Sequence, residues 1–352
     1  MQAIVAHAAK DLRLEDRDLP APTTGELVVA IEQGGICGSD LHYYKNGGFG
    51  EIRLREPMIL GHEVAGRVVK KAENSNDSKT DFEIGQRVAV SPSRPCFNCN
   101  YCFKGLPNHC QNMRFYGSAM PFPHIQGAFC EQLVVSGSQC VVAEGLSAGE
   151  AAMAEPLAVC IHAARQAGNL VGKRVLITGC GPIGLLCLLV AKSSGAAEVV
   201  VTDIADFPLQ LASKIGADAA LKVTQEGEPV LSDWHANKGQ FDVLFECSGV
   251  ASALREAIPA LCPKAVIVQL GLGGDMNIPV QQITAKEIEL RGSFRFHEEF
   301  QTGVNWLQRK LIDVTPLLTH TFPFTSATEA FEMASDRSQA IKVHMQFNAD
   351  AR

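Results

Sequence analysis

The most constraining feature of the chain is a stretch in which an apolar strand runs directly into a glycine-rich loop and then an apolar helix. Residues Arg174–Thr178 (RVLIT) are typical of a buried parallel strand, and Gly179-Cys-Gly-Pro-Ile-Gly184 follows at once. A second apolar run, residues 198–202, ends at Asp203, 19 residues after Gly184. A GxGxxG pattern alone is weak evidence. After a strand, before a helix and trailed by an acid, it predicts a dinucleotide-binding βαβ unit.

The same stretch supplies the expected cofactor contacts. Its glycines let the backbone approach a pyrophosphate, whose charge then lies at the helix N-terminus. Asp203 is placed to accept hydrogen bonds from the adenosine ribose, and Asp206 follows with no Lys or Arg before Lys214, which predicts NAD rather than NADP. The expected cofactor-binding residues are therefore Gly179, Gly181, Pro182, Ile183, Gly184 and Asp203.

With 352 residues the chain is too long for one ordinary core. Short apolar or alternating runs separated by turn residues fill residues 1–150 and predict a β-rich, barrel-like domain. Residues 147–168 are expected to be helical, and further helix and strand signals follow as far as Gly292. The expected fold is α/β, with a Rossmann doubly wound parallel sheet over residues 151–292 and a return of residues 293–352 to the first domain.

Charge and composition exclude several classes of partner. The net charge is -7 and no long basic run is present, which argues against nucleic acid or an anionic membrane. The N-terminus lacks a signal-peptide core, since Lys10 and Asp11 interrupt it, and residues 185–191 form an apolar run too short to span a bilayer. Twelve cysteines without a secretory signal indicate thiols and metal ligands rather than disulfides. We expect a cytoplasmic protein.

Residues 34–63 (GGICGSDLHYYKNGGFGEIRLREPMILGHE) combine a thiol, an imidazole and a carboxylate in glycine-rich surroundings. Cys37, His62 and Glu63 offer the sulfur, nitrogen and oxygen donors that zinc accepts, and three protein ligands leave one position open for a substrate oxygen. A lone Cys or His is usually a packed core residue, but this combination favours a catalytic zinc site.

Glu155 is a second candidate for that site. It lies among Met153, Leu157 and Val159, where a carboxylate needs a partner such as a metal or its water, although a helix-end Glu facing solvent is the plainer alternative. Zn²⁺ with one thiolate and one carboxylate is already neutral, so a second carboxylate would weaken its pull on the substrate oxygen. We expect Cys37, His62 and one of Glu63 or Glu155 as ligands.

A separate cluster lies at about residues 94–112. Cys96, Cys99, Cys102 and Cys110 have the spacing that closes a tetrahedron around zinc with no open position, which predicts a structural site. A nucleic-acid-binding zinc ribbon is disfavoured, because the lobe holds Arg94 and Lys104 but no basic stripe. The chain is therefore expected to bind two zinc ions.

Taken together, Gly61-His62-Glu63 with Gly66, the four-cysteine lobe and the placed GxGxxG resemble the zinc-dependent medium-chain dehydrogenase/reductases over essentially the whole length. Cys37-Gly-Ser-Asp-Leu-His42-Tyr43 and Glu155-Pro-Leu resemble the sorbitol dehydrogenase-like branch. The resemblance implies a GroES-like catalytic domain around the Rossmann domain, a homo-oligomer that is most often a tetramer, and Glu63 ahead of Glu155 as zinc ligand.

The resemblance also implies an NAD-linked alcohol oxidation, in which zinc acidifies the substrate hydroxyl and a hydride passes to the nicotinamide. Ser39 and His42 would relay the released proton. Ser293 and Arg295 would contact the cofactor, and the substrate would meet Tyr43, Arg114, Phe115, Phe294 and Arg295.

The expected substrate is a sugar acid or a polyol. The segments MRFYGSAMPFPH and LRGSFRF resemble the members that act on sugar acids, which favours the conversion of L-idonate to 5-keto-D-gluconate, and Arg114 or Arg295 would clamp the carboxylate. Either arginine could equally lie on the surface. A neutral polyol dehydrogenase acting on sorbitol or xylitol is the alternative, and a non-catalytic zinc-binding structural or regulatory protein is the remote one.

Overall fold

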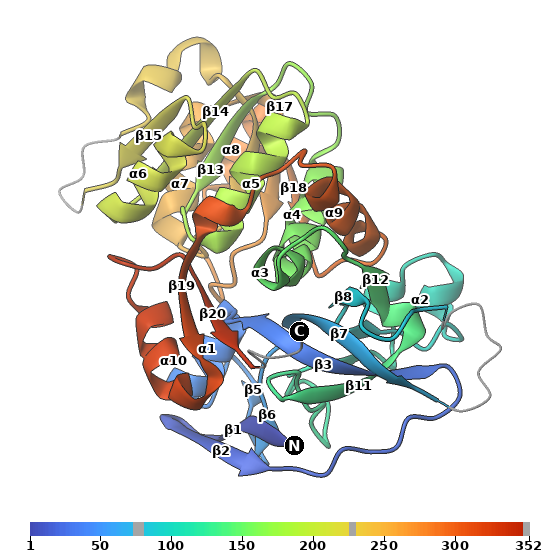
Figure 1. Ribbon diagram of the computed structural model, residues 1–352. Coiled ribbons are helices and arrows are strands. Elements are labelled where there is room, and N and C mark those ends of the chain that lie inside the picture. Colours follow the sequence, from blue (N-terminus) through green and yellow to red (C-terminus); the bar gives the residue numbers. More distant parts are fainter. Residues whose placement is uncertain (73–80, 225–229, 348–352) are drawn as a thin grey trace.

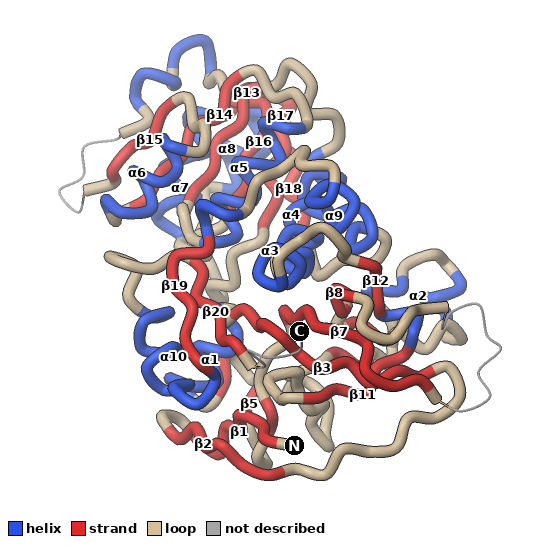
Figure 2. Tube along the Cα trace, in the orientation of Figure 1, coloured by secondary structure: helices blue, strands red, loops and turns tan. Residues whose placement is uncertain are grey.

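The computed structural model describes residues 1–72, 81–224 and 230–347, which are built around two large sheets (Figure 1). Figure 2 shows one sheet in the upper half of the molecule, flanked by helices, and the other in the lower half, where strands and loops predominate. The expected combination of a β-rich part with a parallel α/β part is present.

The upper sheet is parallel throughout, as the apolar strand pattern predicts. Its central strands are buried on both faces, so Val175, Leu176 and Ile177 have no exposed surface. The strand order is β15 (Ala219–Lys222), β14 (Glu198–Asp203), β13 (Arg174–Thr178), β16 (Phe241–Glu246), β17 (Leu261–Gln269) and β18 (Glu289–Gly292).

Helices cover this sheet and join its strands. Pro182 opens α5 directly after the glycine loop, where its missing N–H leaves no hydrogen bond unmade. The covering helices are α4 (Ala154–Ala167), α5 (Pro182–Ser193), α6 (Asp206–Lys214), α7 (Ala251–Ala260), α8 (Val280–Lys286) and α9 (Glu299–Gln308).

The helix expected over residues 147–168 is two helices, α3 (Ala148–Ala152) and α4, which meet at Met153. Pro156 gives the physical reason. Inside one continuous helix it would remove a hydrogen bond and clash with the preceding turn, whereas in the first turn of α4 its missing N–H costs nothing. The break places Glu155 at the start of α4.

The lower sheet is mostly antiparallel and recruits the C-terminal part of the chain. Strands β20 and β3 pair through His344 and Gly35, so residues more than 300 positions apart lie side by side. The order is β12 (Cys140–Val142), β8 (Arg87–Val90), β7 (Glu63–Lys71), β3 (Glu26–Gly35), β20 (Lys342–Gln346) and β19 (Leu318–Pro323), with β11 (Gln132–Ser136) also on β3.

Smaller elements complete this half. They are the sheet of β1 (Gln2–Ala8), β2 (Asp11–Asp16) and β6 (Met58–Ile59), the hairpin of β4 (Gly48–Phe49) and β5 (Ile52–Arg53), the ladder of β9 (Ser93–Arg94) and β10 (Arg114–Phe115), and the helices α1 (Gly38–Asn46), α2 (Asn100–Phe103) and α10 (Ala327–Ser335).

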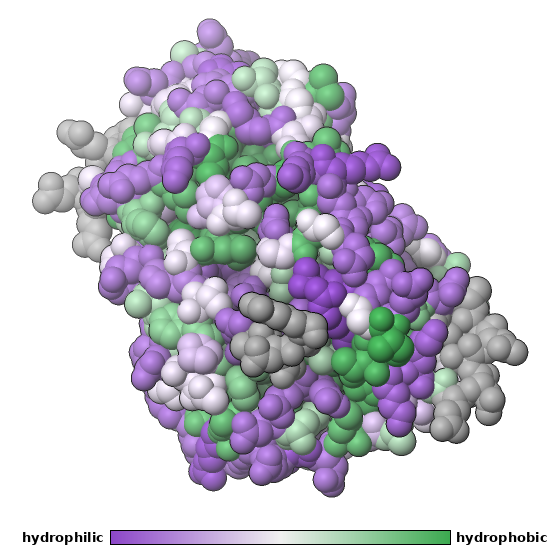
Figure 3. Space-filling view, viewed as in Figure 1, coloured by the Kyte–Doolittle hydropathy of each residue, from purple (hydrophilic) through white to green (hydrophobic). Residues whose placement is uncertain are grey.

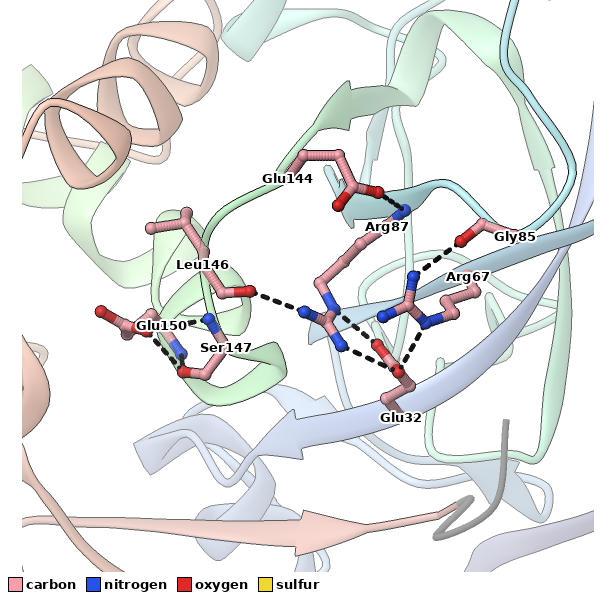
Figure 4. Close-up of polar contacts among 8 residues, drawn as sticks. All are labelled: Glu32, Arg67, Gly85, Arg87, Glu144, Leu146, Ser147 and Glu150. Atoms are coloured by element: carbon pink, nitrogen blue, oxygen red, sulfur yellow. Dashed lines mark hydrogen bonds and ion pairs between the residues drawn. The ribbon is translucent and has the colours of Figure 1, made fainter. Parts of the chain in front are cut away.

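A carboxylate between two arginines ties the lower sheet to the helices above it (Figure 4). Glu32 on β3 accepts hydrogen bonds from Arg67 on β7 (3.1 Å) and from Nε of Arg87 on β8 (2.8 Å). Arg87 also donates to the carbonyl oxygen of Leu146 (2.7 Å), just before Ser147 caps α3. These contacts fix where α3 and α4 leave the sheet, and with them the position of Glu155.

Figure 3 shows hydrophobic residues at the surface in several places, including the middle and the lower right of the view, on an otherwise largely hydrophilic face. Within the described ranges, none of the helices has the length and apolar character needed to cross a bilayer.

Candidate active site

Two neighbouring strands of the lower sheet bring the predicted zinc ligands together. Strand β3 ends at Gly35, two residues before Cys37, and Gly35 pairs with Glu63, the first residue of β7. The ligand atoms of Cys37, His62 and Glu63 lie within 4.8 Å of one another. Sulfur, imidazole nitrogen and carboxylate oxygen at that separation suit a three-ligand zinc site with an open position.

Asp40 is a member of this site that we did not predict. Its side chain is fully buried and accepts hydrogen bonds from the backbone N–H groups of Cys37 (3.0 Å) and Gly61 (3.1 Å). Its carboxylate faces His62, with 3.8 Å between Oδ1 and the imidazole Nδ1. Nδ1 therefore faces Asp40, although it is too far away for a direct hydrogen bond, and Nε2 is left for a metal. A carboxylate on this side of a ligand histidine is typical of zinc sites. The spacing Cys37-x-x-Asp40, that of a capping box, was the available signal.

The charges around His62 act together. Burial by itself would lower the pKa of His62, but the neighbouring Asp40 and Cys37 outweigh burial and raise that pKa. A site that stabilises positive charge on the imidazole also suits a bound cation.

Lys342 was also missed. It is 2% exposed and comes from β20, and its ammonium donates to Glu63 Oε2 (2.6 Å), Glu63 Oε1 (2.8 Å) and the carbonyl oxygen of Ile36 (3.1 Å). Each carboxylate oxygen has two lone pairs, so Glu63 can accept from Lys342 and still reach a metal. Lys342 offsets the charge of Glu63, so a zinc ion held by Cys37 and Glu63 would not be neutralised in the way that the sequence suggested.

Glu155 lies close to this cluster but outside it. Its carboxylate is not among the three ligand groups within 4.8 Å of one another. Burial raises its pKa to about 7, against a lowering by His62 and with a further rise from Glu63. A buried carboxyl group with a pKa near neutrality can hold or release a proton at physiological pH, which fits contact with a substrate oxygen or a water better than permanent ligation.

Aromatic and basic side chains form a wall beside the cluster. The ring of Phe115 lies 5.6 Å from that of His62, and the Arg295 guanidinium lies 4.4 Å from the centre of Phe115 and 4.9 Å from that of Phe294. Tyr43 is buried and its hydroxyl oxygen accepts the backbone N–H of Ala119 (3.0 Å).

Arg295 has an unsatisfied charge. Burial lowers its pKa to about 10, while Glu155 and Tyr43 raise it. One of its nitrogens contacts Met120 Sδ (3.4 Å), and among the described residues no carboxylate lies within ion-pairing distance of it. A guanidinium stacked between two rings without a carboxylate partner is suited to receive one from a ligand.

Arg114 does not belong to this wall, which corrects one half of the predicted carboxylate clamp. Neighbouring residues of a strand point to opposite faces, so when Phe115 on β10 faces His62, Arg114 faces away. Arg114 instead lines a separate cavity with Arg17 and Arg94.

Ser39 and His42 follow Cys37 on α1, three positions apart, so they share one helix face. His42 is exposed and contacts Phe49, with 5.6 Å between ring centres. Burial of part of the ring lowers the pKa of His42, and Lys45 lowers it further. A neutral imidazole at the surface can accept a proton from the site and pass it to solvent.

The four cysteines of the lobe converge as their spacing predicts. Cys99 Sγ lies 3.6 Å from Cys102 Sγ and 4.0 Å from Cys110 Sγ, and Cys110 Sγ lies 3.4 Å from Cys96 Sγ. Backbone N–H groups, that of Cys102 first, lower the pKa of Cys99 to about 6. Four clustered sulfurs with amide support fit a closed tetrahedral zinc site.

The predicted dinucleotide loop has the geometry that the motif requires. Gly179 adopts φ +87°, and a side chain at Gly184 would collide with the carbonyl oxygen of Gly179. A Cβ at Gly181 would meet nothing within 4 Å, which leaves open space at the N-terminus of α5. The loop can therefore admit a pyrophosphate.

Asp203 ends β14 and is mostly buried. Its two oxygens accept the backbone N–H groups of Cys180 (2.6 Å) and Ala205 (2.9 Å), so it also holds the glycine loop in place. The surroundings differ from the expectation in one respect. Lys222 pairs with Asp203 in the β14–β15 register and forms an ion pair with Asp206 (2.6 Å). The absence of Lys and Arg between Asp206 and Lys214 therefore did not exclude a cation that comes from the neighbouring strand β15.

Two more polar groups lie at the carboxyl ends of these strands, Glu246, which we did not predict, and Ser293, which we did. Glu246 is fully buried and accepts from the backbone N–H groups of Ser248 (2.9 Å) and Gly249 (3.1 Å), which fixes the loop after β16. Ser293, a predicted cofactor contact, has a buried hydroxyl with no partner among the described residues. An unpaired buried hydroxyl at the switch region of a Rossmann sheet fits a cofactor group.

Comparison with known proteins agrees with this geometry. Residues 23–145 match the family described as alcohol dehydrogenase GroES-like domain, and residues 182–309 match zinc-binding dehydrogenase. The chain is 43% identical to L-idonate 5-dehydrogenase (NAD(P)(+)) of Escherichia coli strain K12, with 98% of each chain covered. It is 35% identical to the sorbitol dehydrogenase of Gallus gallus, with 97% of this chain and 95% of the relative covered.

Solved structures give the same picture. The crystal structure of L-idonate 5-dehydrogenase from Escherichia coli K-12 superposes with a TM-score of 0.92 at 43% identity, covering 98% of each chain. The protein is therefore a zinc-dependent dehydrogenase of the medium-chain family. Within that family it belongs to the sorbitol dehydrogenase-like branch, as its sequence motifs predict.

Proposed function

We propose that this enzyme oxidises the secondary alcohol of a sugar acid with NAD, most specifically L-idonate to 5-keto-D-gluconate, and catalyses the reverse reduction. The main support for this proposal is the environment of Arg295. Its guanidinium stacks on Phe115 and Phe294, lies near Glu155 and has no carboxylate partner among the described residues. A sugar acid brings the missing carboxylate, which a neutral polyol lacks. The similarity to L-idonate 5-dehydrogenase supports the same choice.

Cys37, His62 and Glu63 would hold the catalytic zinc, and Cys96, Cys99, Cys102 and Cys110 the structural one. Bound zinc supplies a Lewis acid that makes the substrate hydroxyl acidic, and the nicotinamide accepts the hydride. Asp40 orients His62, and Lys342 fixes Glu63. Holding these groups rigidly is what the protein contributes to the reaction.

Glu155 would contact the reacting oxygen, since its pKa of about 7 lets it share a proton near neutral pH. Ser39 would take the proton from the site, and His42 would release it to solvent from its partly exposed ring.

The preference for NAD now depends on Asp203. Asp206 is neutralised by Lys222, but Asp203 is mostly buried and its recorded partners are backbone N–H groups. A 2′-phosphate placed against that carboxylate would be repelled. We propose NAD as the preferred cofactor, with Ser293 and Arg295 near its nicotinamide end.

The substrate is tested by following NADH absorbance with L-idonate, sorbitol and ethanol in parallel, then with Arg295→Met. Removal of a guanidinium from a buried carboxylate should cost about 2–5 kcal/mol in kcat/KM for idonate and leave sorbitol little changed. Arg337→Met is the matched control, because it removes the same charge from an exposed position outside both the zinc site and the other cavity. Equal losses on both substrates would make Arg295 structural, and a wild-type preference for sorbitol would support the polyol alternative.

We also propose a cytoplasmic homo-oligomer, with a tetramer favoured. All twelve cysteines are free thiols, which suits a reducing compartment. Sedimentation of the zinc-loaded protein would measure the oligomeric state, and a monomer at micromolar concentration would contradict this part of the proposal.

A further inference from the structure

A cavity of about 580 Å³ lies in the β-rich half, away from the zinc cluster. It falls within the size range of pockets that hold small organic molecules. Its charged side chains are three arginines against two carboxylates, namely Arg17, Arg94 and Arg114 against Asp18 and Glu26. The lining therefore has one more basic than acidic side chain, in a protein whose net charge is -7.

Two of its arginines oppose each other across a ladder. Arg94 on β9 and Arg114 on β10 are register partners in the antiparallel pair. Directly opposed side chains have Cβ atoms about 4.5–5.5 Å apart, and like charges in that position are destabilising. An anion bound between the two guanidiniums would relieve this repulsion.

The ion pairs and hydrogen bonds of the three arginines leave some of their guanidinium N–H groups without an acceptor. Arg94 has an ion pair with Glu26 (3.3 Å), whereas the guanidinium of Arg114 makes no hydrogen bond or ion pair in the described ranges 1–72, 81–224 and 230–347. Arg17 pairs with Glu15 through one Nη (2.7 Å), but its Nε is buried and unpartnered within the same ranges. Guanidinium donors without acceptors around a cavity are a site for carboxylate or phosphate.

The rest of the lining indicates the size and character of the ligand. Leu19, Pro20, Ile59 and Leu133 give apolar walls, and Gln126 and Gln132 add amide groups. Such a mixture suits the carbon chain and hydroxyls of a sugar derivative better than a bare inorganic ion.

We propose that this cavity binds a polyhydroxylated organic anion, a sugar acid or a sugar phosphate, at Arg94 and Arg114, separately from the catalytic site. Strand β10 connects the two places. Arg114 reaches the cavity, while the adjacent Phe115 packs on His62 and beneath Arg295. An anion that holds Arg114 also holds the strand that carries this wall of the active site, so the cavity is placed to regulate substrate binding.

The test is isothermal titration calorimetry on the zinc-loaded full chain carrying Arg295→Met, which removes the anion-binding group of the active site. The probes are D-gluconate, D-glucose 6-phosphate and sorbitol. One of the two anions should bind, and Arg114→Gln should weaken its binding at least tenfold. Sorbitol can enter the catalytic site, so any affinity for sorbitol should be the same with and without Arg114→Gln. The tighter of gluconate and glucose 6-phosphate identifies the anionic group as carboxylate or phosphate.

Arg337→Gln is the matched control, because it removes the same charge from an exposed position elsewhere. Arg114→Lys should restore part of the affinity, since it restores the charge without the guanidinium fork. The proposal is overturned if Arg114→Gln binds the anion as tightly as its parent, if Arg114→Gln weakens the binding of sorbitol as much as that of the anion, or if neither anion binds. This result does not depend on the proposed substrate. If the enzyme does not act on sugar acids, the anion affinity should still fall when Arg114 is replaced by Gln.

Discussion

Replacing Lys342 by Met tests whether Glu63 binds the catalytic zinc. The ammonium makes three hydrogen bonds, two of them to Glu63, and both side chains are at most 2% exposed. Methionine keeps most of the stem's packing, so the main effect is to leave the Glu63 carboxylate buried without its cation. Breaking a buried pair in this way costs about 3–5 kcal/mol.

The free energy of unfolding that Lys342→Met loses should depend on whether zinc is present. When zinc is bound, its charge partly replaces the ammonium beside Glu63. The loss of unfolding free energy should then be smaller by about 1.5–3 kcal/mol, the size of a hydrogen bond to a charged group. His62→Ala provides the comparison, since it removes a catalytic ligand and leaves the four-cysteine lobe intact.

The assay is urea denaturation at saturating zinc of four proteins: wild type, Lys342→Met, His62→Ala and the double variant. Lys342→Met should cost more in the His62→Ala background than in the wild type. Equal losses in both backgrounds would refute Glu63 as a zinc ligand. Lys10→Met is the control, because the pair that Lys10 forms with Glu332 is about half exposed and should contribute less than 1 kcal/mol.

Three further predictions follow from the two halves of the molecule. Metal analysis should find two zinc ions per chain. Cys99→Ser should lose one and lower stability, and His62→Ala should lose the other and abolish turnover with the fold intact. One zinc in active wild-type protein would contradict this. The ratio of kcat/KM for NAD to that for NADP should exceed ten, because Asp203 repels a 2′-phosphate, and comparable values would overturn the assignment. Glu299→Gln should cost about 2–3 kcal/mol at pH 7, whereas the exposed Glu298→Gln should cost less than 0.5 kcal/mol. Burial raises the pKa of Glu299, but hydrogen bonds from neighbouring groups outweigh burial and lower that pKa to about 2. The stabilising effect of Glu299 is therefore present above about pH 4.5 and lost as the pH falls toward 2. Unfolding curves that show the same Glu299→Gln deficit at pH 7 and pH 3 would contradict that shift.

The parallel sheet was predictable because its signals are local. A strand buried on both faces reads as an unbroken apolar run, and the strands at β13, β14 and β16 begin where that pattern begins. The glycines after β13 are likewise required by the geometry of a single turn. The four cysteines of the lobe also lie within 15 residues of sequence, so spacing alone predicts their convergence.

The groups that we missed depend on contacts between distant segments. Lys342 meets Glu63 only because β20 joins the edge of β3, and no feature of residues 342–346 identifies that partner in advance. The alternation of Lys342 and His344 with Val343 and Met345 does indicate one polar face on a strand. What that face meets is decided by the order of strands in the sheet.

The two arginines proposed as a clamp show how strand geometry separates residues that a motif groups together. Arg114 and Phe115 are adjacent in sequence, and both were assigned to the substrate because the segment containing them resembles related enzymes. A strand sends neighbouring side chains to opposite faces, so only one of the two can line the catalytic site. Phe115 packs on His62, and Arg114 faces the arginine-lined cavity. The segment that resembles related enzymes therefore contributes one residue to the zinc site and its neighbour to a different cavity. The function of each residue depends on the face of the strand from which its side chain projects.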